Sequence, residues 1–97
     1  MNYQYPFDIS WSKQEVIDVI HFFTLIERAY EKGVGREELM NAYRKFKQIV
    51  PSKSEEKQIF ADFEKESGYS SYHTVKQAKD QDASGIVKMK KNTNTRR

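Results

Sequence analysis

The fold is decided by residues 12–33, which read SKQEVIDVIHFFTLIERAYEKG. The first four residues have the pattern of a capping box, in which the Ser12 hydroxyl accepts from the Glu15 backbone N–H and the Glu15 carboxylate accepts from the Ser12 N–H. Gly33 stands where a helix turns off in the left-handed region, and Lys32 suits the negative end of the helix dipole. These signals predict a long helix over residues 12–32.

The apolar residues of this helix form two stripes of unequal width. At about 100° per residue, most of them share roughly half of the circumference. Ile17 and Leu25 lie outside that arc, with His21 midway between them. A surface helix buries a single stripe, so this helix is predicted to be contacted from more than one side. Ile17, His21 and Leu25 are therefore the residues that we expect a partner to contact.

A second helix is predicted over residues 36–50. Its apolar side chains recur on one narrow face, and Pro51 prevents the helix from continuing. Residues 33–35, Gly-Val-Gly, are expected to form the turn between the two helices. This is the pattern of an ordinary core helix.

Two further helices are predicted over residues 53–67 and 71–80. The first begins with another capping-box pattern, from Ser52 to Glu55, and ends before Gly68. The second takes Ser70 or Ser71 as its N-cap. Most of the surface of the helix over residues 53–67 carries charged side chains, so only one narrow edge of it is expected to pack against the other helices.

The N-terminal segment alternates strictly between polar residues and aromatic or apolar ones. Period two is typical of an extended chain with one buried side. We interpret residues 1–11 as an extended strap laid over the helices, with Trp11 packing just before the helix cap. The alternative, an aromatic edge that a partner uses through strand addition, stays open. The alternating residues are Tyr3, Tyr5, Phe7, Ile9 and Trp11.

The net charge of +3 resides at the C-terminal end. Residues 81–97 contain five basic and one acidic side chain, whereas residues 1–80 contain twelve basic and thirteen acidic ones. Since residues 81–97 are polar and lack a periodic apolar face, we expect a flexible basic tail. The near-neutral remainder disfavours a nucleic-acid-binding face, which normally carries its own basic patch.

The composition indicates one small folded domain. One tryptophan, six tyrosines and six phenylalanines make the chain too apolar for a disordered protein, despite 32% charged residues. The absence of cysteine excludes disulfides and fits a reducing compartment. The sequence has neither a signal-peptide pattern nor an apolar run long enough to cross a bilayer. We therefore expect a cytoplasmic protein that makes no membrane contact.

No pattern in the sequence predicts catalysis. The histidines, His21 and His73, lack the accompanying cysteine or carboxylate spacing of a metal or general-base site. The carboxylate doublets at residues 37–38 and 55–56 lie in first helical turns, where the helix dipole explains them. We predict no catalytic, cofactor-binding or metal-ligating residue, no cofactor and no small-molecule substrate.

Residues 61–79 suggest an alternative function. A helix, the turn SGYS and a second helix are similar to a helix-turn-helix unit, whose second helix enters the major groove of DNA. Two departures weaken the similarity: the spacing from Gly68 to residues 74–75 is longer than in the repressor-type motif, and Ala61 misses the usual small-residue position. In this alternative the contacts to bases and phosphates come from Tyr72, His73, Thr74, Lys76 and Gln77.

Several segments within residues 1–80 resemble the YktA-like family of small uncharacterised cytosolic proteins of Bacillus-type bacteria. The resemblance implies a compact all-α fold and brings with it no assigned activity, cofactor or catalytic residue. The segments that carry it are YPFD at 5–8, WS at 11–12, AYEKGV at 29–34, REEL at 36–39, AYRKFK at 42–47, IVPSK at 49–53 and SGYSSY at 67–72.

Taken together, these patterns predict an all-α fold, a small four-helix array or bundle within residues 1–80. The strap at residues 1–11 and the tail at residues 81–97 flank it. The favoured function is that of a non-enzymatic cytosolic protein that binds an unknown protein partner or itself, as a homodimer. The alternative is nucleic-acid binding through residues 61–79, aided by the basic tail.

Overall fold

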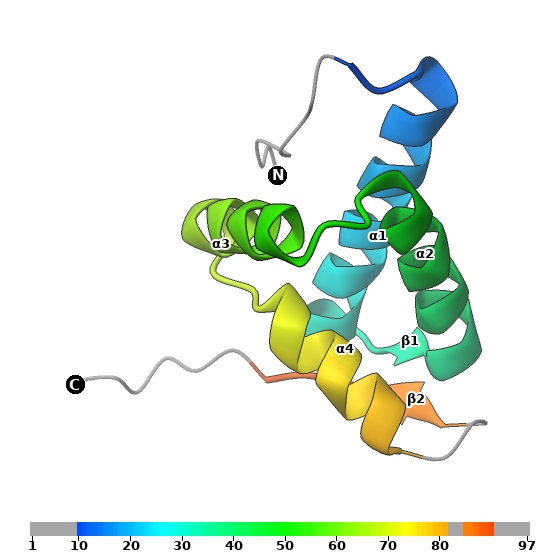
Figure 1. Cartoon of the computed structure of the whole chain (residues 1–97). Helices are drawn as coiled ribbons and strands as arrows, with labels where there is room; N and C mark the ends of the chain where they lie inside the picture. The colour runs from blue at the N-terminus through cyan, green and yellow to red at the C-terminus, as the bar shows by residue number, and fades with distance from the viewer. Residues whose placement is uncertain (1–9, 82–84, 91–97) are drawn as a thin grey trace.

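Helix α1 (Lys13–Glu31) is the spine of the computed structural model, which describes residues 10–81 and 85–90 (Figure 1). The predicted capping box forms in both directions: the Glu15 N–H donates to Ser12 Oγ at 3.1 Å, and the Ser12 N–H donates to Glu15 Oε1 at 2.8 Å. At the other end the N–H groups of Lys32 and Gly33 both donate to the Arg28 carbonyl at 2.7 Å. Gly33 turns the chain at a φ of +102°, which favours glycine.

Three more helices follow, within a residue or two of the predicted bounds. They are α2 (Arg36–Ile49), α3 (Lys53–Ser67) and α4 (Ser71–Asp80). Helices α1 and α2 lie side by side as a hairpin, while α3 and α4 lie against one flank of that pair (Figure 1). Gly68 ends α3 at a φ of +82°, and Ser70 is the N-cap of α4. The prediction of a small all-α array is confirmed.

The core is built around five phenylalanine rings from three helices, which we call the phenylalanine cluster. Four of the rings are fully buried, and Phe60 is 8% exposed. Ring centroids lie 4.5 Å apart for Phe23 and Phe63 and 5.0 Å apart for Phe22 and Phe46. Offset or edge contacts of this kind add about 0.5–1.5 kcal/mol per pair beyond the area that they bury. The cluster consists of Phe22 and Phe23 from α1, Phe46 from α2, and Phe60 and Phe63 from α3.

The prediction of a flexible tail from residue 81 onward is wrong for residues 85–90. Strand β2 (Ile86–Val87) pairs antiparallel with β1 (Val34–Gly35), with Val34 opposite Val87. The Val87 side chain is fully buried, and the Met89 N–H donates to the Ala29 carbonyl at 2.8 Å. Two residues are too few to show a strand period, so the sequence contains no local signal for this pairing.

Helix α4 and its C-cap residue Gln81 also bind the C-terminal segment. Gln81 Nε2 donates to the Ile86 carbonyl at 3.1 Å, and Gln77 Nε2 donates to the Lys88 carbonyl at 3.3 Å. These bonds occupy backbone acceptors that an isolated strand would leave to solvent. Residues 33–35 are therefore not a plain turn, because Val34 and Gly35 take part in a small sheet that joins α1, α2 and the C-terminal segment.

Of the predicted strap, residues 1–9 lie outside the described part of the chain. Trp11 is half-buried and packs against the core, next to the Ser12 cap. Within the described residues, no helix is both long and apolar enough to cross a membrane.

Candidate binding groove

A groove of about 790 Å³ lies between α2, α3 and α4. Apolar and aromatic side chains come from all three helices: Tyr43 from α2, Phe60 from α3, and Tyr72 and Val75 from α4. Phe60 and Val75 are almost buried, whereas Tyr72 is 60% exposed. The groove therefore combines a narrow apolar floor with one projecting aromatic ring.

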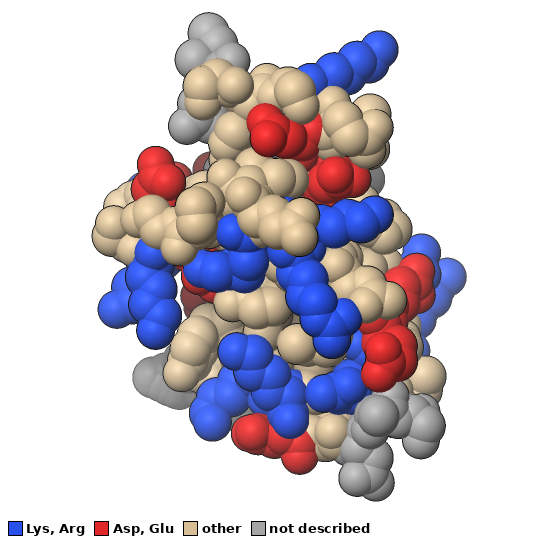
Figure 2. Space-filling view, turned by 45° about the vertical axis from the view of Figure 1, so that its right-hand side comes forward, with Lys and Arg blue, Asp and Glu red and all other residues tan. Residues whose placement is uncertain are grey.

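Charged side chains surround this floor. Lysines line the groove at positions 53 and 57 of α3 and 76 and 79 of α4, and carboxylates line it at positions 56, 64 and 80. Figure 2, which brings α2 forward, shows basic side chains gathered over the middle and lower part of one face. The exposed pair Lys76–Asp80, at 3.5 Å, contributes little to stability.

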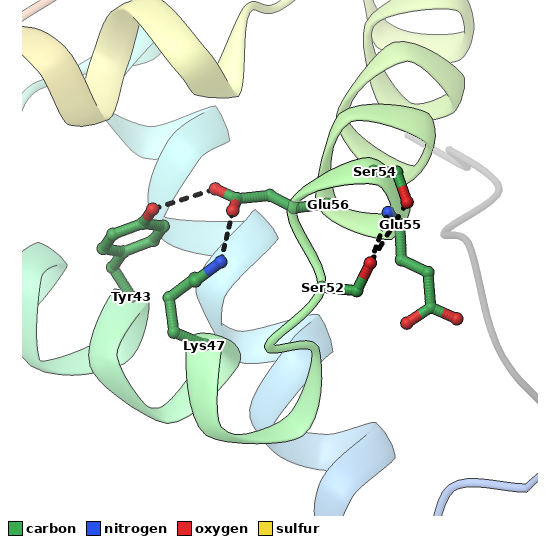
Figure 3. Close-up of polar contacts among 6 residues, drawn as sticks. All are labelled: Tyr43, Lys47, Ser52, Ser54, Glu55 and Glu56. Atoms are coloured by element: carbon green, nitrogen blue, oxygen red, sulfur yellow. Dashed lines mark hydrogen bonds and ion pairs between the residues drawn. The ribbon is translucent and has the colours of Figure 1, made fainter.

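The carboxylate of Glu56 is held from one side of α2 (Figure 3). Tyr43 Oη donates to Glu56 Oε2 at 2.8 Å, and Lys47 Nζ donates to Glu56 Oε1 at 2.5 Å. Tyr43 and Lys47 are four residues apart, so they share a face of α2, while Glu56 lies in the first turn of α3. We call these three side chains the α2–α3 clamp. The clamp fixes the start of α3 against α2.

Burial raises the pKa of Tyr43 to about 12, and the hydrogen bond to Glu56 and the negative charge of Glu56 add to the effect. Ionisation would place a phenolate directly beside a carboxylate. The hydroxyl of Tyr43 is therefore a proton donor at neutral pH and cannot serve as a base. The Lys79 ammonium lies 5.5 Å from the centre of the same ring, which places a cation over its electron-rich face.

The N-terminus of α3 is capped in one direction. The Glu55 N–H donates to Ser52 Oγ at 3.3 Å, and Ser54 Oγ lies 3.1 Å from Ser52 Oγ. Figure 3 shows the Glu55 carboxylate turned away from Ser52. The predicted bond from the Glu55 N–H to the Ser52 hydroxyl is thus confirmed. The predicted reciprocal bond from the Ser52 N–H to the Glu55 carboxylate is wrong.

A second hollow, of about 690 Å³, runs along α4 from Ser70 to Asp80 and is also lined by Met89 and Lys90 of the C-terminal segment. Ser70 Oγ lies 2.7 Å from His73 Nδ1 and accepts from the His73 backbone N–H at 3.1 Å, while the Ser70 N–H donates to Tyr30 Oη at 3.1 Å. A serine beside a histidine is also the pairing of nucleophilic enzymes. Here the N-cap of α4 accounts for the contact, because the hydroxyl occupies the capping position.

The sequence profile of the uncharacterised protein family UPF0223 matches residues 2–87. This chain belongs to that family. It is 62% identical to the UPF0223 protein OB1419 of Oceanobacillus iheyensis, over 89% of this chain and 98% of the relative. It is 55% identical to the UPF0223 protein YktA of Bacillus subtilis, over the same shares of the two chains. It is also 55% identical to a UPF0223 protein of Bacillus pumilus, over 92% of this chain and the whole relative.

The match confirms the resemblance to the YktA-like family and carries it past residue 80. The UPF0223 profile extends to residue 87, the second residue of β2. The family region therefore includes the strand that closes on Val34, in agreement with the structure and not with a boundary at residue 80.

The predicted partner stripe on α1 of this UPF0223 member is only partly at the surface. Ile17 is 49% exposed and His21 is exposed, but Leu25 is 1% exposed. Leu25 cannot contact a partner, so its assignment is wrong. The second apolar stripe arises because the C-terminal part of α1 is packed from more than one side, whereas Ile17 and His21 are exposed within the part of the chain that the structure describes.

The residues predicted to contact nucleic acid likewise include both exposed and buried side chains. Tyr72, His73, Lys76 and Gln77 are exposed on α4, and the rings of Tyr72 and His73 meet edge to face at 5.2 Å. Thr74 is fully buried and donates from Oγ1 to the Ser70 carbonyl at 2.7 Å. Its predicted role as a base contact is therefore wrong, since the helix turns it into the core.

The α2–α3 clamp and the position of Lys79 beside it were not predicted from the sequence. Tyr43 and Lys47 carry a usable signal, a polar pair at four-residue spacing beside the core face of a helix. Glu56 carries no such signal, because an acidic residue in the first turn of a helix is already accounted for by the helix dipole. Only the angle between α2 and α3 brings its carboxylate back to α2.

Proposed function

We propose that this chain is a non-enzymatic protein of the cytoplasm that acts by binding another protein. The observation that carries the proposal is Tyr72, whose ring is 60% exposed at the rim of the groove. A tyrosine in this position offers a large apolar surface and a hydroxyl, and it loses little conformational freedom on binding. For these reasons tyrosine is enriched among the residues that dominate protein interfaces.

The chemistry of the groove supports a binding role over a catalytic one. Both carboxylate oxygens of Glu56 accept hydrogen bonds from the α2–α3 clamp, and Tyr43 keeps its proton well above neutral pH. The hydrogen bonds between α2 and α3 therefore account for the positions of both Tyr43 and Glu56. The absence of cysteine from the sequence favours the reducing cytoplasm.

Affinity capture tests the proposal. The full chain is immobilised and exposed to a lysate of a bacterium that carries a family member, beside the variants Tyr72→Ser and Ile17→Ser. Proteins that the wild type and Ile17→Ser retain, and that Tyr72→Ser loses, are the expected result. Recovery of no protein above a blank matrix contradicts protein binding.

Self-association is the second form of the same proposal. Ile17 and His21 are both exposed on α1, away from the groove, and they offer a site for a second copy. Light scattering of the purified protein measures the mass in solution. A monomer at high micromolar concentration removes this form, and a dimer that Ile17→Ser dissociates supports it.

Nucleic-acid binding remains a second candidate function. The exposed rings of Tyr72 and His73, with Lys76 one turn further along α4, could stack on bases and neutralise phosphate. This candidate predicts an affinity for mixed DNA or RNA that falls steeply with salt. Because residues 85–90 belong to the fold, the tail is tested by replacing Arg96 and Arg97 with Gln and not by deletion. No binding at low salt rules the candidate out.

A further inference from the structure

We infer that the groove between α2, α3 and α4 binds an acidic peptide segment of a partner protein, with one apolar side chain of that segment seated beside Tyr72. The inference rests on the proposed protein-binding function and names the site and the chemistry of the partner. It follows from the shape of the groove, from its charge and from the way its walls are held.

The shape suits one anchored side chain. A volume of about 790 Å³ is within the range of small-ligand pockets, so it accommodates a large side chain and its neighbouring backbone. Phe60 and Val75 provide apolar contact from below, and Tyr72 stands at the rim with most of its ring exposed. An aliphatic or aromatic side chain placed here would cover the ring and remove its apolar surface from water.

The charge selects an acidic partner. Two of the carboxylates that line the groove already have cationic neighbours, since Glu56 is bound by Lys47 and Asp80 lies 3.5 Å from Lys76. The other charged side chains that line it are Lys53, Lys57 and Lys79, opposed by Glu64. Asp or Glu residues on either side of the apolar anchor would meet this excess of lysines. Exposed charge pairs of this type contribute to selectivity and to the association rate more than to affinity.

A peptide fits this charge pattern better than a nucleic acid does. The phosphate backbone of a nucleic acid presents negative charge at regular short intervals, and Glu64 and Asp80 in the groove would repel part of it. A peptide can place neutral residues opposite these carboxylates and acidic residues opposite the lysines. The mixed lining therefore favours a protein segment.

The α2–α3 clamp makes the groove ready for binding. It ties the first turn of α3 to α2 through two hydrogen bonds to one carboxylate, and those two helices form two of the three walls. A groove that is already formed loses little conformational entropy when a ligand enters, so more of the contact energy appears as affinity.

Fluorescence anisotropy tests the inference with three labelled peptides and the full chain. The first, EDELFDED, is acidic with an apolar centre; the second, KKKLFKKK, has the opposite charge; the third, EDESSDED, lacks the anchor. We expect the first to bind about tenfold more tightly than the third, the second not to bind, and the affinity of the first to fall as salt is added.

Variants locate the binding surface. Tyr72→Ser and the double charge reversal Lys57→Glu with Lys79→Glu should each weaken binding of EDELFDED by about tenfold. Ile86→Ser is the matched control, because Ile86 is 63% exposed, lies on β2 and does not line the groove, so the affinity should stay unchanged. Thermal unfolding of each variant establishes that it is folded, and Lys57→Gln with Lys79→Gln gives a milder second version of the charge test.

The outcomes separate this inference from the proposed function. Equal binding of the acidic and basic peptides, binding of neither, or full affinity in the groove variants overturns the groove as an acidic-peptide site. If affinity capture still retains a protein that Ile17→Ser loses, protein binding stands and only this site is refuted. Displacement of EDELFDED by single-stranded DNA, with tighter binding of the DNA, also overturns it in favour of a nucleic acid.

Discussion

The phenylalanine cluster and the groove are both rich in aromatic rings, yet they treat those rings in opposite ways. In the cluster, rings from three helices stack on one another and are closed off from water. In the groove, Tyr43 is half-buried and Tyr72 projects from the surface. Phe60 belongs to both regions, because it stacks on Phe22 and Phe46 and also lines the groove.

The difference follows from the phenolic hydroxyl. A phenylalanine is stabilised most by complete burial, whereas a tyrosine must also find a hydrogen-bond partner or remain in contact with water. Tyr43 finds Glu56, and Tyr72 stays at the surface. The same class of side chain thus builds the core in one place and leaves an accessible aromatic surface in another.

The largest effect is expected for Phe23→Ala. Phe23 contacts Phe22, Phe46 and Phe63 and is fully buried, so the substitution removes ring contacts and opens a cavity. Its cost in the free energy of unfolding should be about 3–5 kcal/mol, measured by urea denaturation. Ile17→Ala on the exposed side of the same helix should change that free energy by less than about 0.5 kcal/mol. Equal effects would show that the cluster is not the core.

A smaller, pH-dependent effect is expected for Tyr43→Phe. At neutral pH the variant loses the hydrogen bond to Glu56, worth about 1 kcal/mol at this half-buried position. In the folded protein the pKa of Tyr43 is raised to about 12, above the usual value of about 10. The folded state therefore retains a proton that the unfolded chain releases, and the wild type loses this stabilisation as the pH rises from 10 through 12.

Thermal unfolding of the wild type and Tyr43→Phe between neutral pH and pH 12 measures this effect. The stability advantage of the wild type should be full below pH 10 and should shrink above it. Both proteins contain the same lysines, so their difference reports on the Tyr43 hydroxyl together with its effect on Glu56, which Lys47 also contacts. An advantage that stays constant to pH 12 would contradict the raised pKa.

The smallest effect on stability is expected for Tyr72→Ala. Because the ring is largely exposed, its loss should change the free energy of unfolding by no more than about 0.5 kcal/mol. The substitution should nevertheless weaken binding at the groove, as inferred above. A stability loss comparable to that of Phe23→Ala would place Tyr72 in the core and remove the contrast between the two regions.

The helices could be predicted because their signals are local. Helix ends are marked by capping residues, glycine and proline, whose effect is confined to one helical turn. In this chain those residues are Ser12, Glu15, Pro51, Gly68 and Ser70. The position of Val87 could not be predicted, since its partner Val34 lies more than fifty residues away and the strand is two residues long. No local pattern represents a pairing of that kind.

The candidate site was predictable only in part for the same reason. Tyr72 and Lys76 could be placed at the surface from the face of α4 that they share, whereas Thr74 could be assigned to the core only once α4 was docked. Leu25 was misplaced because the elements that cover the second stripe of α1 are fixed by tertiary packing and not by the period of α1 itself. The groove needs three helices at defined angles, which no single segment encodes.

The sheet between Val34 and Val87 has a consequence for the order of events during synthesis. Synthesis proceeds from the N-terminus at about 5–20 residues per second. Because α1 to α4 precede residues 85–90 in the chain, they leave the ribosome first. Until then Val34 and the Ala29 carbonyl lack the neighbours that they have in the finished fold, namely Val87 and the Met89 N–H. The helices can therefore assemble first, and the small sheet with β1 forms only after residues 85–90 have been synthesised.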